Sequence, residues 1–192
     1  ILLCLMIVPI LICIKYSRRI KSDVASSIVK CLIFTIVTIL SNGLSAFSGN
    51  ETFSYIMEAL YRFSFDLMLI YVLQYSQQYT RVFHEVSPFK KGCFIIAYLD
   101  GILLFLNIIF HNVFTIETVR FPNFDMYHVA DKSIIFYFHY VFAYGLVFCI
   151  IASFIIKIIQ IPDFYRKKYL PILVLICVIT VSKFICGISE FP

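Results

Sequence analysis

The chain alternates six long apolar blocks with short charged stretches. Hydrophobic residues run on within each block, without the strict alternation of a membrane β-strand, so the pattern predicts helices. About 20 helical residues are needed to cross a hydrocarbon core that is about 30 Å thick. The predicted spans are residues 1–14, which is too short to cross, and then 28–47, 53–75, 93–110, 134–156 and 170–188.

Composition places these helices in a membrane. Of the 192 residues, 61% are hydrophobic and only 14% are charged, which is more apolar surface than a soluble domain of this size can bury. We therefore predict an all-α, polytopic membrane helix bundle whose main partner is the lipid bilayer. The seven cysteines form no CxxC pair, and we interpret them as small apolar residues in lipid.

The net charge of +5 reflects a membrane topology and not a nucleic-acid partner, because the basic residues cluster between apolar blocks. Only Arg120 and Lys132 fall in the loops of one side. The three loops of the other side hold eleven: Lys15, Arg18, Arg19, Lys21, Arg81, Lys90, Lys91, Lys157, Arg166, Lys167 and Lys168. Positive residues favour cytoplasmic loops, so the first span is expected to begin outside. We expect six spans of an N-out, C-in seven-helix body, with residues 1–192 truncated at both ends.

One exterior segment, residues 111–133, is long enough to have structure of its own. Residues 114–121 are rich in β-branched and aromatic side chains, and Pro122-Asn123 supplies a turn. The segment is either a small hairpin that caps the bundle or an irregular loop.

Ionisable residues inside predicted spans are costly in lipid and normally face the bundle interior. The third span carries Glu58, Arg62 and Asp66 at i, i+4 spacing, so all three lie on one helical face. This ladder is either an ion-pair seam that docks the helix against its neighbours or the polar lining of a ligand-binding or proton-responsive site.

Depth along the helices groups further polar residues. Asp100 is expected at the depth of Asp66, so these two form a second polar pair. The candidate site for a ligand or stimulus is a layer in the outer half of the bundle, comprising Glu58, Arg62, Asn107, His139 and Lys183. Two members have simpler explanations, since His139 fits an interfacial aromatic run and Lys183 fits a residue that reaches the interface or pairs with an acid.

No enzyme motif is visible. The sequence lacks HExxH, GxSxG and a glycine-rich phosphate loop, and it shows no carboxylates and histidines at metal-ligand spacing. We therefore predict no catalytic residue, no cofactor and no metal site.

Several segments resemble one family. These are the basic loop at residues 161–169, the stretches 57–62 and 75–79, Asp100, and the pair His139-Tyr140. Together they resemble the seven-transmembrane N-terminal regions of bacterial histidine kinases and related GGDEF diguanylate cyclases. The resemblance implies an input module that regulates a catalytic domain beyond the last helix. It also implies a bacterial plasma membrane, an unknown small ligand or stimulus, and a homodimer formed through the full-length protein.

Two other classes stay open. A transporter would use helices broken by Gly or Pro near the membrane midplane, whereas most prolines here lie at span edges or in loops. A eukaryotic seven-helix receptor would share the topology and could use the glycosylation sequon at Asn50. However, the third span ends in Gln77-Gln78-Tyr79-Thr80-Arg81, a poor match to the acidic-Arg-Tyr signature of that class.

Overall fold

The computed structural model describes the backbone of residues 2–46, 50–82, 87–120 and 125–188, and the side chains of residues 6–45, 50–82, 88–118 and 127–181. The described chain forms six helices and two strands. They are α1 (Leu2–Ser17), α2 (Asp23–Ala46), α3 (Glu51–Thr80), α4 (Ser87–Phe110), β1 (Phe114–Arg120), β2 (Asp125–Lys132), α5 (Ile134–Gln160) and α6 (Asp163–Ile188).

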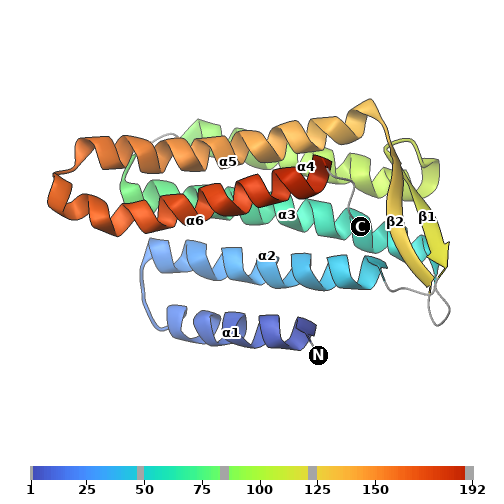
Figure 1. Ribbon diagram of the computed structural model, residues 1–192, viewed down its shortest axis with the longest axis horizontal. Coiled ribbons are helices and arrows are strands. Elements are labelled where there is room, and N and C mark those ends of the chain that lie inside the picture. Colours follow the sequence, from blue (N-terminus) through green and yellow to red (C-terminus); the bar gives the residue numbers. More distant parts are fainter. Residues whose placement is uncertain (1, 47–49, 83–86, 121–124, 189–192) are drawn as a thin grey trace.

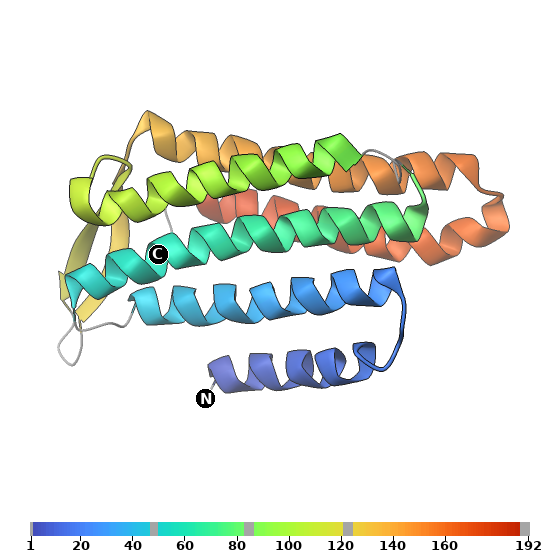
Figure 2. The ribbon, with the colours of Figure 1, turned by 180° about the vertical axis from the view of Figure 1, so that it is seen from behind.

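The helices lie side by side in one bundle and the strands cross one of its ends (Figure 1). α3 is central, since it packs against α2, α4 and α5. α1 lies at the edge of the bundle beside α2, which the view from behind also shows (Figure 2). The all-α class predicted from the hydrophobic blocks is confirmed. The described part of each block lies in a helix, although several helices continue into polar residues because backbone hydrogen bonding does not stop where hydropathy falls.

Local signals explain the ends of the central helix. The side chain of Asn50 caps α3 by accepting a hydrogen bond from the backbone N–H of Phe53 at 3.2 Å. At the other end Arg81 adopts a left-handed conformation with φ of 57°, a common way for a helix to stop. Between these caps α3 runs for 30 residues, which carries its polar face along the whole bundle.

Small polar residues hold α2 against α3. The Ser27 hydroxyl donates to the Gln78 side chain at 2.8 Å, and the hydroxyls of Thr38 and Ser64 lie 3.0 Å apart. Short side chains of this kind let two helices approach closely and hydrogen-bond where water is scarce. The interface between these helices is therefore polar as well as close.

Three of the described helical segments are long and apolar enough to cross a membrane: Asp23–Ser45, Pro88–Phe110 and Ile134–Gln160. α1 provides only a shorter apolar stretch, Met6–Ser17. α3 has charged residues in its middle, and α6 begins with a basic segment. By length and composition the chain is a membrane protein, while six spans within a seven-helix body stay a prediction.

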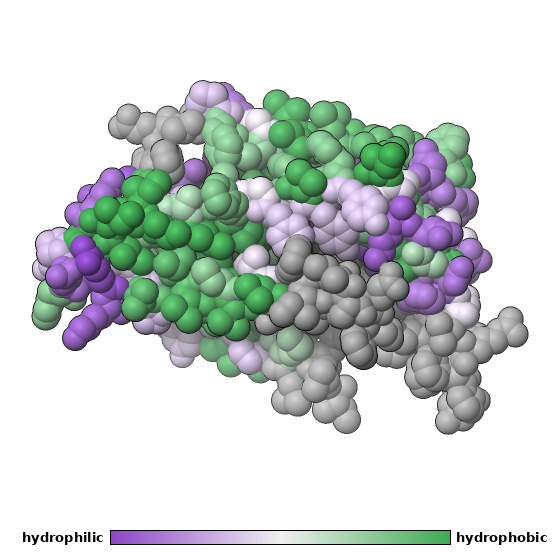
Figure 3. All heavy atoms as spheres, turned by 45° about the horizontal axis from the view of Figure 1, so that its top comes forward, coloured by the Kyte–Doolittle hydropathy of each residue, from purple (hydrophilic) through white to green (hydrophobic). Residues whose placement is uncertain are grey.

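The exterior of the bundle is apolar, and its interior holds polar and charged side chains alongside apolar ones. Ile109, Val141 and Phe148 are 70–72% exposed, whereas Asp66 and Asn107 have no exposed surface. In Figure 3 hydrophobic residues cover much of the face between the two ends, and the most hydrophilic residues gather toward the ends. A helix bundle in water instead carries most of its charged and polar side chains on its surface. Lipid is therefore the surrounding medium that fits this surface.

The helix ends alternate between the two ends of the bundle, as the count of basic residues predicts. The C-termini of α1, α3 and α5 and the N-termini of α2, α4 and α6, where the basic residues cluster, lie at the end opposite the strands (Figure 1). Which end faces the cytoplasm stays a prediction.

The segment between α4 and α5 is a hairpin, so the interpretation as an irregular loop was wrong. β1 and β2 pair antiparallel, from Phe114 opposite Lys132 to Arg120 opposite Asp125. The hairpin is fixed to the bundle because the Tyr55 hydroxyl of α3 accepts a hydrogen bond from the backbone N–H of Ile116 at 3.0 Å. Its base is also buried in an apolar cluster made of Tyr55, Ala59, Leu104, Val113, Phe114, Ile116 and Phe136.

Candidate functional site

The ladder predicted on α3 is a pair in the structure. Arg62 forms its ion pair with Glu58, one turn before it, and among the described residues no ion pair joins Arg62 to Asp66. Glu58 also accepts a hydrogen bond from the Ser45 hydroxyl at 3.2 Å. We call these two residues the Glu58–Arg62 pair. Both are buried, so each charge depends on the other for compensation.

Aromatic rings complete the environment of Arg62. Its Cζ lies 4.2 Å from the ring centroid of Phe136, and 5.7 to 5.9 Å from the rings of Phe114, Tyr61 and Tyr140. A guanidinium over aromatic faces gains cation–π stabilisation, which is larger when water is excluded. The Arg62 guanidinium is thus enclosed by the Glu58 carboxylate and by aromatic rings.

A second polar group lies one turn further along α3. Nδ1 of His139, on α5, lies 2.8 Å from Oδ2 of Asp100 on α4 and 3.2 Å from Oδ2 of Asp66 on α3. The three side chains are 0 to 3% exposed. We call them the carboxylate–histidine cluster. One ring nitrogen serves two carboxylates, and Asp100 takes the hydrogen bond.

Asp66 is left without a hydrogen bond in this cluster. Neither of its carboxylate oxygens has a hydrogen-bond partner among the described residues, although Oδ2 is within ion-pair distance of His139. A buried carboxylate is normally paired and fully hydrogen-bonded, because its desolvation is costly. Asp66 therefore departs from that rule.

The five residues predicted to share one layer are distributed differently. Asn107 serves the hairpin: its amide donates to the carbonyl of Phe114 at 2.9 Å, and its oxygen accepts from the backbone N–H of Val113 at 2.7 Å. Glu58 pairs with Arg62, whereas His139 reaches the Asp66–Asp100 pair. Lys183 is in α6, but its side chain lies outside the described residues. The layer is thus not a single cluster among the described side chains, because sequence gives depth along a helix and not rotation.

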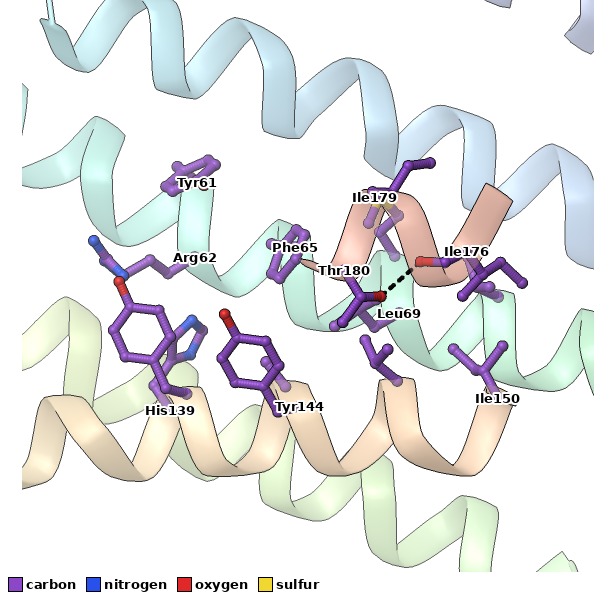
Figure 4. A pocket seen from close by; sticks show the side chains of 15 residues that line it. Tyr61, Arg62, Phe65, Leu69, His139, Tyr144, Ile150, Ile176, Ile179 and Thr180 are labelled. Carbon is purple, nitrogen blue, oxygen red and sulfur yellow. Dashed lines mark hydrogen bonds between the residues drawn. The ribbon is translucent and has the colours of Figure 1, made fainter. Parts of the chain in front are cut away.

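A pocket of about 420 Å³ lies between α3, α5 and α6. Arg62 and His139 lie toward one end of it, and Ile150 and Ile176 toward the other (Figure 4). The full lining is Tyr61, Arg62, Phe65, Met68, Leu69, Val72, His139, Tyr140, Ala143, Tyr144, Val147, Ile150, Ile176, Ile179 and Thr180. Two predicted residues therefore share one cavity.

Sequence reasoning missed the polar groups that accompany them. Tyr140 and Tyr144 line the pocket from α5, and Tyr61 lines it from α3. The i, i+4 spacing of Tyr140 and Tyr144 was a usable signal, since it places these two tyrosines together on one helix face. Tyrosines are frequent at membrane interfaces, so spacing alone does not distinguish a pocket from an interfacial belt.

The chain has no match among known protein families, curated proteins or solved structures. The resemblance to the membrane regions of histidine kinases and diguanylate cyclases therefore stays a prediction. The geometry of the two polar groups and of the pocket provides the basis for a functional proposal.

Proposed function

We propose that this chain is the membrane-embedded input module of a bacterial signal-transduction protein, and that it binds a small amphipathic molecule between its helices. The observation that carries the proposal is the pocket between α3, α5 and α6, which has a polar end and an apolar end (Figure 4). Its volume of about 420 Å³ is in the range of small-molecule sites, about 300–1,000 Å³. The chain itself is expected to catalyse nothing.

The polar end suits a head group that accepts hydrogen bonds. Arg62 lines the pocket, and its buried Nε has no hydrogen-bond partner among the described residues. A buried donor without an acceptor costs about 1–3 kcal/mol, and a ligand oxygen would recover that loss. Because the Arg62 charge is already compensated by Glu58, a neutral head group fits as well as an anionic one.

The apolar end suits a short hydrocarbon chain. Leu69, Val147, Ile150, Ile176 and Ile179 lie in this part of the lining, and they come from three different helices. Relative to water, burial of each ligand methylene there contributes about 0.8 kcal/mol. A ligand with a polar head and an apolar tail therefore matches both ends.

The position of the pocket suggests how binding could become a signal. α6 packs against α5, and Ile176, Ile179 and Thr180 bring it to the pocket opposite α3. A ligand that contacts α3, α5 and α6 together favours one arrangement of α6 over others. A coupling of about 1–3 kcal/mol is sufficient to regulate an attached histidine kinase or diguanylate cyclase domain.

Photoaffinity labelling tests the proposal. The chain, reconstituted in phospholipid nanodiscs, is irradiated with a ten-carbon fatty acid or fatty alcohol that carries a diazirine near the end of its tail. We expect crosslinks in α5 and α6 close to Ile150 and Ile176, competed by unlabelled probe. Val147→Phe, which fills the pocket, should abolish the specific label. The matched control is Val141→Phe on the same helix, since Val141 is 70% exposed and does not line the pocket.

Labelling spread over the exposed faces of α4 and α5, with no competition and no effect of Val147→Phe, would show lipid-like contact only and would contradict the proposal. Specific crosslinks near Arg62 instead of Ile150 would reverse the proposed orientation of the ligand and contradict the assignment of the two ends.

A further inference from the structure

The carboxylate–histidine cluster has the composition and spacing of a metal site. Asp66, Asp100 and His139 come from three consecutive helices in the bundle, α3, α4 and α5, and each offers one ligand atom. These three atoms lie within 4.8 Å of one another. We infer that they bind a divalent first-row transition-metal cation.

The distances fit such an ion. Bonds of about 2.1 Å from oxygen or nitrogen to a divalent cation place neighbouring ligand atoms about 3.0 Å apart in octahedral geometry and about 3.4 Å apart in tetrahedral geometry. Nδ1 of His139 lies 2.8 and 3.2 Å from the two Oδ2 atoms. Both distances are close to these values, and the ligand atoms offered by the two aspartates lie within 4.8 Å of each other.

A hydrogen bond between His139 and Asp100 would by itself account for the shorter distance. It does not account for Asp66, which is fully buried: its Oδ2 lies only at ion-pair distance, 3.2 Å, from Nδ1 of His139, and its Oδ1 has no hydrogen-bond partner among the described residues. A bound cation would be a partner for one carboxylate oxygen of Asp66, one of Asp100 and the imidazole nitrogen of His139 at the same time. Asp66 is thus the independent observation that favours a bound ion over a closed hydrogen-bond network.

Charge supports the same conclusion. Two carboxylates and one imidazole carry a net charge of −1 when the histidine is protonated and −2 when it is neutral. A divalent ion bound by two carboxylates and a neutral imidazole makes the cluster neutral, which removes the cost of an uncompensated charge in a low-dielectric interior. Arg62 shares the pocket with His139, but its own charge is compensated by Glu58.

The donor set selects the class of metal. Imidazole nitrogen with carboxylate oxygen suits Mn²⁺, Fe²⁺, Co²⁺ and Zn²⁺, whereas Ca²⁺ and Mg²⁺ favour all-oxygen sites. His139 also lines the pocket, so an ion can reach the cluster from there. Positions not filled by protein remain for water or for an oxygen of a bound ligand, as in metal sites with three protein ligands.

Titration with Mn²⁺ tests the inference, because this ion prefers oxygen and nitrogen over the seven cysteine thiols. The chain in detergent is stripped of metal, and free Mn²⁺ is counted by its electron paramagnetic resonance signal. We expect saturable binding of one Mn²⁺ per chain that excess Mg²⁺ does not displace. Asp66→Asn, Asp100→Asn and His139→Gln should each weaken binding at least about tenfold. Glu58→Gln, a buried carboxylate outside the cluster, and Asp163→Asn, an exposed one, should bind as the wild type does.

Co²⁺ provides a second measurement that needs no variant. Bound to the wild type, it should give visible absorption typical of nitrogen and oxygen ligands, without the near-ultraviolet band of a cobalt–thiolate bond. The inference is overturned if the wild type binds no Mn²⁺ saturably, if folded Asp66→Asn keeps wild-type affinity, or if Co²⁺ shows thiolate ligation. Ligand labelling in the pocket is a separate result, so this inference can fail while the proposed function stands.

Discussion

The Glu58–Arg62 pair and the carboxylate–histidine cluster both use buried charges of α3, yet they are organised in opposite ways. The pair is local: its two members are one turn apart on the same helix and balance each other. The cluster joins three helices and holds two carboxylates for one imidazole. The pair balances its own charge and leaves one donor, the Arg62 Nε, without an acceptor among the described residues, whereas in the cluster a whole carboxylate, that of Asp66, accepts no hydrogen bond there and the negative charge is not balanced. The difference teaches that buried charge by itself does not indicate a cation site, whereas buried negative charge without compensation does.

The largest expected effect comes from breaking the closed pair. Arg62→Leu leaves the Glu58 carboxylate buried without its ion partner, which should cost about 3–5 kcal/mol of folding free energy. The measurement is unfolding by SDS in mixed micelles, followed by circular dichroism. The double variant Glu58→Leu/Arg62→Leu should recover most of the loss. If Arg62→Leu were as stable as the wild type, the Glu58 carboxylate would not depend on Arg62 for charge compensation.

Asn107→Leu removes another complete set of hydrogen bonds, this time at the base of the hairpin. The backbone N–H of Val113 and the carbonyl of Phe114 lose their buried partner, at an expected cost of about 1–3 kcal/mol. Hydrogen exchange should accelerate at Val113 and Ile116 and stay unchanged in α2. Unchanged exchange at the hairpin would mean that Asn107 is not what fixes it.

Gly101→Ala changes the spacing of α3 and α4 beside the cluster. A Cβ at Gly101 would lie 2.5 Å from a ring carbon of Phe63, so that ring must move. We expect a loss of about 1 kcal/mol in stability and weaker Mn²⁺ binding, because Asp100 is adjacent in sequence. Gly145→Ala is the matched control, since nothing lies within 4 Å of a Cβ there. Equal behaviour of the two variants would contradict a tight contact between α3 and α4.

The smallest effect on stability is expected at the open cluster. Asp66→Asn in metal-free protein should cost no folding free energy and can raise stability, since it removes a buried negative charge that is not compensated. The same SDS titration measures this change, and the stability of Glu58→Gln, a variant of the Glu58–Arg62 pair, is compared with it. A loss at Asp66 as large as that at Arg62 would remove the distinction between the two groups.

Local spacing predicted some of this site correctly and could not predict the rest. The i, i+4 spacing predicted the Glu58–Arg62 pair, because both residues belong to one helix. The equal depth of Asp66 and Asp100 was also visible from counting residues. The contact of His139 with both depends on how α5 is rotated, which a single sequence does not encode locally.

Sequence spacing likewise predicted the depth of Asn107 in the bundle but not its hydrogen-bond partners. Those partners are the backbone groups that return with the hairpin six and seven residues later. Periodicity predicts which residues enter the bundle, and it also predicted the six helices and the β-rich segment. Tertiary contacts alone decide which polar residues are satisfied and which are not. Asp66 was therefore predictable as a buried acid, though not as the unsatisfied one.

Pulsed electron paramagnetic resonance of the Mn²⁺-bound chain tests the open cluster most directly. Modulation of the Mn²⁺ echo by a directly coordinated ¹⁴N reports an imidazole ligand. We predict this coupling in the wild type and in Glu58→Gln, and its loss in His139→Gln. An echo modulated only by water protons in the wild type, or a nitrogen coupling that persists in His139→Gln, would contradict the account.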